Sequence, residues 1–231
     1  LIDGKLKLTA RNRTLDVLLK AYGNGWTIAF LEQGQLATTL DAALPGGPSP
    51  TRRSVAVQWV SGDTWRLYEG DSCAGMGGGP FVDRGTFTAP EVEIFSADPA
   101  PDNRVEYVAA CENGLHRYYR GNLVADNFAI TADSTVRQRT MNRVQIESYL
   151  RSVVPSESPS SWGGTNGTAP GMHALRAQAV AARSYALAGD TRYGLADTCD
   201  DIFCQVYRGF GTNAAGAVTV FESTNGDLAV S

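Results

Sequence analysis

Glu157 is the residue of this sequence whose setting best suits acid–base chemistry. It lies between Pro155 and Pro159, and prolines restrict the backbone, so a carboxyl group there can be held facing a groove. A glutamic acid in such a place can give a proton to a leaving oxygen and then, as a carboxylate, accept one. A glutamate in a proline-rich turn is more often simply hydrated, so its position alone leaves both interpretations open.

Three polar side chains of one predicted helix could assist Glu157. Gln178 and Tyr185 are seven residues apart and therefore share a helix face. A glutamine among so many alanines needs hydrogen-bond partners if it is buried. Gln178 could therefore brace the segment that carries Glu157, or fill an ordinary structural role. Arg183, about a turn and a half further along the helix, could hold a carboxylate or contact a substrate.

Some reactions use a pair of carboxyl groups, and Glu147 is the candidate for a second one beside Glu157. Ten residues of mostly helical chain separate it from Glu157. At about 1.5 Å per residue, that distance is too large for a pair unless the chain folds back. In the first turn of a helix, the negative charge of Glu147 would be stabilised by the helix dipole. We therefore expect Glu147 to act structurally.

The four cysteines form an even set, Cys73, Cys111, Cys199 and Cys204. Their spacing lacks the paired Cys-x-x-Cys of a zinc ribbon, which favours disulfides and an oxidising compartment. We expect the pairs Cys199–Cys204, which closes a short loop, and Cys73–Cys111, whose members adjoin predicted strands. Four unrelated buried thiols are the alternative.

Two predicted helices must position these residues. Apolar residues within 146–154 recur at helical spacing, and Pro155 should end that helix before Glu157. A second helix should begin near Pro170 and run to about residue 187. Small residues on it would let another backbone approach closely. The residues expected to do so are Ala174, Ala177, Ala181 and Ala182.

The preceding part of the chain is predicted to be rich in β-structure. Residues 54–130 contain alternating patterns typical of strands. A short helix is predicted over residues 14–21, with Leu15, Leu18 and Leu19 on one face, and a linker over residues 45–50. The fold class expected is therefore α+β.

The composition argues against nucleic acid as a partner and against a membrane-spanning segment. The 231 residues have a net charge of −4 and are 43% hydrophobic, which is ordinary for a globular protein and gives no basic surface for nucleic acid. No stretch approaches the roughly 18 apolar residues that span a bilayer. Because Leu1 is not an initiator methionine, we expect that a leader has been removed.

Three strings in a fixed order carry a family resemblance. They are YLRSVVPSESP at residues 149–159, RAQAVAARSY at residues 176–185, and CQVYRG at residues 204–209. Together they resemble the SpoIID/LytB family of bacterial cell-wall proteins, the stage II sporulation protein D and amidase enhancer proteins. The resemblance runs from near Tyr119 to the end, roughly the carboxyl-terminal half. It implies a mixed α/β SpoIID-like domain at residues 117–231, after an amino-terminal segment 1–50 and a β-rich region 51–116.

The resemblance also implies an activity. Members cleave glycan strands as lytic transglycosylases, and the glutamate of the Val-Val-Pro-x-Glu string, Glu157 here, is catalytic. The partners implied are peptidoglycan glycan strands outside the cytoplasm, the products are 1,6-anhydromuramic acid ends, and no cofactor is implied. A non-catalytic wall-binding module that stimulates an N-acetylmuramoyl-L-alanine amidase is the alternative. In a third interpretation, residues 54–130 form a carbohydrate- or protein-binding adaptor.

Departures from the family pattern qualify these implications. Some members bind zinc through a histidine and two cysteines in the loop matching residues 197–204. This sequence keeps Cys199 and Cys204 but has no histidine there, and its aspartates are poor substitutes for imidazole or thiolate, so we expect no bound metal. Ser158 replaces a methionine. The chain ends at Ser231, before a Ser-Gly-Gly-rich segment of the family, so we expect part of the groove to lie beyond it.

Overall fold

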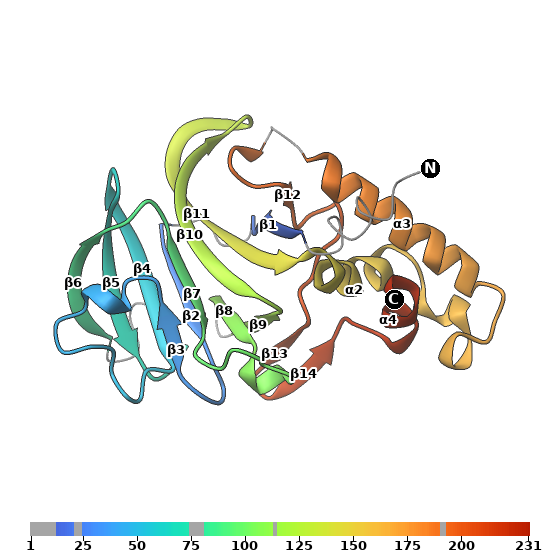
Figure 1. Cartoon of the computed structure of the whole chain (residues 1–231), viewed down its shortest axis with the longest axis horizontal. Coiled ribbons are helices and arrows are strands. Elements are labelled where there is room, and N and C mark those ends of the chain that lie inside the picture. Colours follow the sequence, from blue (N-terminus) through green and yellow to red (C-terminus); the bar gives the residue numbers. More distant parts are fainter. Residues whose placement is uncertain (1–12, 21–24, 74–80, 113–114, 190–192) are drawn as a thin grey trace.

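The computed structural model describes residues 13–20, 25–73, 81–112, 115–189 and 193–231. In Figure 1 the strands of two sheets occupy one side of the molecule, and the helices gather at the other side. The fold is therefore α+β, as the sequence predicts, with the helices mainly after residue 145.

The first sheet has six strands among the described residues. Their spatial order is β12 (Thr198–Cys199), β1 (Thr14–Leu18), β11 (Asp133–Gln145), β10 (Asn122–Ile130), β7 (Val92–Ser96) and β3 (Leu36–Thr38). Neighbouring strands are antiparallel, except that β12 pairs with β1 in parallel, with Leu18 opposite Cys199. This pairing brings the start of the chain beside a segment close to its end.

The second sheet has eight described strands, all antiparallel to their neighbours. Their order is β14 (Ala217–Val220), β13 (Gly211–Ala214), β9 (Leu115–Tyr119), β8 (Val108–Glu112), β2 (Thr27–Phe30), β4 (Ser54–Ser61), β5 (Thr64–Gly70) and β6 (Val82–Thr88). Both sheets take strands from the ranges 1–50, 51–116 and 117–231. One hydrophobic core contains buried residues from all three ranges.

Three α-helices lie beside the sheets in the described chain. They are α2 (Ile146–Glu157), α3 (Met172–Ala188) and α4 (Thr224–Val230). Short 3-10 turns accompany them, η1 (Asp41–Ala43) and η2 (Arg104–Glu106) in the β-rich part, and η3 (Ser160–Gly163) and η4 (Thr165–Gly167) between α2 and α3. The predicted apolar stripe of α2 is buried as expected, with Ile146, Tyr149, Leu150, Val153 and Val154 facing the core.

The helix predicted over residues 14–21 is wrong, because residues 14–18 form strand β1. Leu15 and Val17 are fully buried and alternate with a partly exposed Asp16. The leucines also fit helical spacing, but β1 lies between β11 and β12 and uses its backbone groups in both ladders. Tertiary pairing therefore outweighs the local pattern, as is common for short apolar runs.

The helix α2 also ends later than predicted, because it includes Pro155 and extends to Glu157. A proline removes one helical hydrogen bond, here the one to the Arg151 carbonyl, and this loss matters less in a last turn than in a helix interior. The next bonds persist, since the Ser158 N–H donates to the Val154 carbonyl at 3.0 Å. Glu157 is therefore a helix-end residue and not part of a separate turn.

The packing face of α3 differs from the predicted one. Ala174, Ala177 and Ala181 are exposed, and of the four predicted alanines Ala182 alone is buried. The buried face instead consists of Met172, Leu175, Ala179, Ala182 and Ala186. The many alanines of this helix fit either face, so their presence alone could not identify the correct one.

Both expected disulfides are present. Cys73–Cys111 joins the region after β5 to β8 across a sequence separation of 38, and Cys199–Cys204 spans a separation of 5. In the chain-entropy account, closing the longer loop stabilises the fold by about 4 kcal/mol and closing the shorter one by about 2 kcal/mol. Residues 45–50, the predicted linker, form an irregular connection between β3 and β4.

Gly121, between β9 and β10, provides a test of the packing between strands. It has a φ of 77°, and a Cβ there would lie 2.2 Å from the backbone oxygen of Arg143. We predict that Gly121→Ala lowers the free energy of unfolding by about 2–4 kcal/mol, because backbone strain adds to this clash. Urea denaturation measures the loss.

Gly62 in the turn between β4 and β5 is the matched control. It also has a positive φ, 49°, but a Cβ added there would meet no atom within 4 Å. Gly62→Ala should therefore cost only the strain, about 1 kcal/mol. Equal losses for the two variants would contradict the role given to the contact with Arg143.

Candidate active site

The third family string lies against the first. Residues 205–209, here called the strap, have no regular secondary structure and follow Cys204. Burial alternates along the strap: Gln205 and Tyr207 are 8% and 3% exposed, Val206 is partly exposed, and Arg208 is exposed. One face of the strap therefore belongs to the core, and the other faces solvent.

Hydrogen bonds attach the strap to α2. The Val206 N–H donates to Glu157 Oε1 at 2.7 Å, and the Arg208 N–H donates to Ser152 Oγ at 3.1 Å. These bonds satisfy backbone groups that no strand partner satisfies. They also place the Glu157 carboxylate beside the strap, although 49 residues separate Glu157 from Val206 in the chain.

Buried aromatic side chains fix the inner face of the strap. The Tyr149 hydroxyl donates to Gln205 Oε1 at 3.0 Å, and the Tyr207 hydroxyl donates to Asn142 Oδ1 at 2.6 Å. The rings of Tyr149 and Tyr207 have centroids 4.8 Å apart, and Tyr119 lies 6.0 Å from Tyr207. The strap is thus bonded to α2 and to β11 at the same time.

Gly209 ends the strap and admits no side chain. Its φ is 71°, and a Cβ would lie 2.5 Å from the Tyr118 backbone oxygen and 2.9 Å from the Tyr119 ring. The following residue, Phe210, donates its N–H to that same Tyr118 oxygen at 2.8 Å. Residue 209 must therefore be glycine where the strap passes Tyr118 and Tyr119 and joins the second sheet.

The Glu157 side chain is exposed at the end of α2. One carboxyl oxygen accepts the Val206 N–H, and the other makes no hydrogen bond to any described residue. A carboxyl group held by one oxygen, with the second oxygen accessible, can exchange a proton with an external oxygen atom. This geometry allows the chemistry predicted for Glu157.

Glu147 and Arg183 form an ion pair away from Glu157. Arg183 donates to both Glu147 oxygens, at 2.6 and 3.1 Å, and to the Val230 carbonyl at 3.3 Å. These contacts join α2, α3 and α4. Because Glu147 lies in the first turn of α2 and Glu157 in the last, about 15 Å of helix separates them.

The other two predicted site residues lie on α3. Gln178 is partly buried and forms no hydrogen bond to any described residue, so its bracing role stays a prediction. Tyr185 is 41% exposed, and its predicted supporting role also stays a prediction.

Asp200 is a titratable group that sequence analysis missed. Burial raises its pKa to about 6, opposed by the Lys20 N–H, which donates to Asp200 Oδ1 at 3.1 Å. Burial also raises the pKa of Tyr149, and the charges of Glu157 and Asp200 raise it further. The charge of Asp200 thus acts on Tyr149, whose hydroxyl binds Gln205 of the strap.

Sequence analysis gave no role to Tyr149, Ser152 or Val206. Tyr149 and Ser152 lie within the first family string, and Val206 within the third, so the strings themselves were the available signal. The contacts of Val206 and Arg208 involve their backbone N–H groups. Nearly every residue has such a group, so the residue types could not indicate these contacts.

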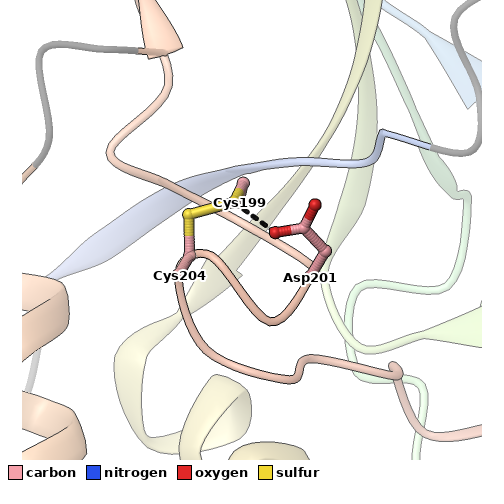
Figure 2. Close-up of side chains that lie close together, drawn as sticks. All are labelled: Cys199, Asp201 and Cys204. Atoms are coloured by element: carbon pink, nitrogen blue, oxygen red, sulfur yellow. Dashed lines mark hydrogen bonds between the residues drawn. A yellow bond between two sulfur atoms is a disulfide. The ribbon is translucent and has the colours of Figure 1, made fainter.

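Cys199, Asp201 and Cys204 have potential ligand atoms within 4.8 Å of one another (Figure 2). The two sulfurs form a disulfide, and Asp201 binds Lys20 Nζ at 2.7 Å. Zinc requires thiolates or neutral imidazoles at such a site, and disulfide sulfurs supply neither. As they stand, these residues do not fit a zinc ion.

Glu147 and Arg183 lead to a stability prediction. Glu147→Gln should lower the free energy of unfolding by about 1–2 kcal/mol, because it leaves the partly buried guanidinium without its charged acceptor. Thermal or urea unfolding measures the change. In a double-mutant cycle with Arg183→Gln, an interaction energy near zero would show that the pair does not stabilise the fold.

Asp200 leads to a pH prediction. Its pKa is raised from 3.8 to about 6 in the folded state, so the folded protein retains this proton at pH values where the unfolded chain has lost it. The contribution of Asp200 to stability is therefore greatest below pH 3.8 and is lost as the pH rises through 6.

We predict that Asp200→Asn, which cannot ionise, raises the free energy of unfolding by about 2 kcal/mol at neutral pH, allowing for partial exposure. The same substitution should have little effect below pH 3.8, where Asp200 is protonated in both the folded and the unfolded state. Urea denaturation at the two pH values provides the comparison, and an equal effect at both would contradict the assignment.

Comparison with known protein families matches residues 134–230 to SpoIID, described as stage II sporulation protein. The matched range contains α2, α3, the strap, α4 and most of β11. No curated protein and no solved structure matches the chain. Within the described residues, no helix has the length and apolar character required to cross a membrane. Residues 134–230 are therefore a SpoIID domain, of a family linked to cell-wall remodelling.

Proposed function

We propose that this protein binds peptidoglycan glycan strands and cleaves them as a lytic transglycosylase, with Glu157 as general acid and base. The observation that carries the proposal is the exposed Glu157 carboxyl at the end of α2, fixed through one oxygen by the Val206 N–H. The match to SpoIID over residues 134–230 supports the substrate class.

The proposed reaction needs one carboxyl group. Protonated Glu157 donates its proton to the glycosidic oxygen as the bond between that oxygen and C1 of muramic acid breaks. The C6 hydroxyl of the same sugar then attacks C1, and the Glu157 carboxylate accepts the hydroxyl proton. The product is a 1,6-anhydro ring, Glu157 is protonated again, and no water is consumed.

The distance between the two glutamates of α2 supports this choice over hydrolysis. Retaining hydrolases place their carboxyl groups about 5–5.5 Å apart and inverting ones about 6.5–9.5 Å apart. Glu147 lies about 15 Å along the helix and is paired with Arg183. It therefore suits neither role beside Glu157.

An extracytoplasmic location belongs to this proposal. Both disulfides, Cys73–Cys111 and Cys199–Cys204, persist best in an oxidising compartment. The second one holds the start of the strap to β12, so the candidate site itself depends on a bond of this kind. A secreted or wall-associated protein would meet its glycan substrate there.

We predict that Glu157→Gln lowers the rate of glycan cleavage by at least 10²–10⁴-fold, because glutamine cannot exchange the proton. Glutamine keeps an oxygen that can accept the Val206 N–H, so glycan binding should change little. Mass spectrometry of muropeptides, after incubation of the full natural chain with purified wall material, detects the anhydromuramic products.

Glu147→Gln is the control, and we expect it to act mainly on stability. Release of anhydromuramic products at an unchanged rate by Glu157→Gln would rule out the catalytic assignment. If the wild-type protein releases none and instead stimulates an added amidase, the protein is a non-catalytic enhancer.

A further inference from the structure

The strap exposes an arginine that has no carboxylate partner. Arg208 is exposed, and its guanidinium forms no ion pair with any described carboxylate. Other arginines of the matched helices and strands differ in this respect, because Arg183 binds Glu147 through two nitrogens and Arg120 binds Glu222 in the same way. Among the residues that the structure describes, Arg208 is therefore a cation of the strap without an ion-pair partner.

The backbone of Arg208 is fixed, although its side chain is exposed. Its N–H donates to Ser152 Oγ at 3.1 Å, and its carbonyl accepts from Arg117 Nη1 at 3.3 Å. The next residue, Gly209, tolerates no side chain. The guanidinium lies over the Phe221 ring, with its central carbon 5.6 Å from the ring centroid. A contact of this kind orients the cation and leaves N–H groups available for a ligand.

The Arg208 side chain leaves the strap on its outer face, two residues from the backbone group that binds Glu157. The side chains of Gln205 and Tyr207 enter the core, so those of Val206 and Arg208 lie on the opposite, outer face. Val206 and Arg208 are two residues apart, which in extended chain is about 7 Å. A ligand in contact with the Glu157 carboxyl therefore lies within the length of an arginine side chain from the Arg208 backbone.

We propose that Arg208 binds a carboxylate of the glycan substrate and positions the sugar that Glu157 protonates. The inference rests on the proposed function. A guanidinium matches a carboxylate with two parallel hydrogen bonds, which fix orientation as well as distance. Muramic acid carries a carboxyl group on the ring whose C1 bond is broken, and attached peptides carry further ones. Arg208 is thus a positioning and specificity residue.

Binding measurements in the Glu157→Gln background test this proposal without cleavage. Three glycans of equal length serve as probes: one with free lactyl carboxylates, one with those carboxylates converted to neutral amides, and one with intact peptides. Arg208→Gln should weaken binding of a carboxylate-bearing glycan at least tenfold and leave binding of the amide glycan unchanged. The Arg208→Lys variant should bind the carboxylate-bearing glycan more tightly than Arg208→Gln and more weakly than the unsubstituted residue, because lysine keeps the charge and loses the paired geometry.

Arg176→Gln is the matched control. Arg176 is an exposed arginine of α3 that forms no ion pair with a described residue, so its removal changes the net charge equally. Thermal unfolding verifies that each variant is folded. The lactyl group is the source if the loss is confined to the peptide-free glycan, and the peptide is the source if the loss is confined to the glycan with peptides.

Equal loss on the amide glycan, or loss of the same size in Arg176→Gln, would overturn the proposal, as would the absence of any loss. The test of Arg208 is independent of the test of the proposed cleavage. Anhydromuramic products that depend on Glu157 but not on Arg208 would refute this inference alone. A carboxylate-dependent loss in a protein that releases no products would retain Arg208 in a binding module and refute cleavage.

Discussion

The bonding between α2 and the strap is the constraint on which the candidate site depends. The strap has no strand partner, so its N–H groups need other acceptors, and Glu157 and Ser152 supply them. Both ends of the strap are fixed, upstream by the Cys199–Cys204 disulfide to β12 and downstream by Gly209 at the second sheet. Through β12 the strap is also connected to β1, near the start of the chain. A SpoIID domain that is matched from residue 134 onward thus relies on a strand outside the matched range.

The distribution of ion pairs separates structural charges from candidate functional ones. Arg52 is fully buried and binds both Asp41 and Glu69, and Arg143 binds Asp16 and Glu91 in the first sheet. Such pairing is needed because an unpaired buried charge is costly. Glu157 and Arg208 are exposed and form no ion pair with each other or with any other described residue. The backbone of Arg208 and one carboxyl oxygen of Glu157 are held by hydrogen bonds, whereas the exposed Arg208 guanidinium and the other Glu157 oxygen bind no charged group of the described residues.

Sequence reasoning predicted the parts of the site that depend on local pattern. The apolar stripe of residues 146–154 identified α2 and its buried face, and it placed Glu147 in the first turn. It failed where tertiary contacts decide, as at residues 14–18, where leucines at helical spacing form a strand between two partners. It also ended α2 too early at Pro155, because a proline close to a helix end removes one bond and need not end the helix. Sequence reasoning could not predict the Val206 contact, because this contact joins a backbone N–H to a side chain 49 residues away.

The position of Asp200 bears on whether one carboxyl group is enough. Asp200 is the other carboxyl group that acts on Tyr149 together with Glu157, so it is the alternative to Glu147 as the second acid of a hydrolase. Burial raises the pKa of its carboxyl group, and the Lys20 N–H binds it. Of the two groups, Glu157 has the exposed side chain, so the reaction proposed for it relies on this one carboxyl group and on the sugar's own hydroxyl.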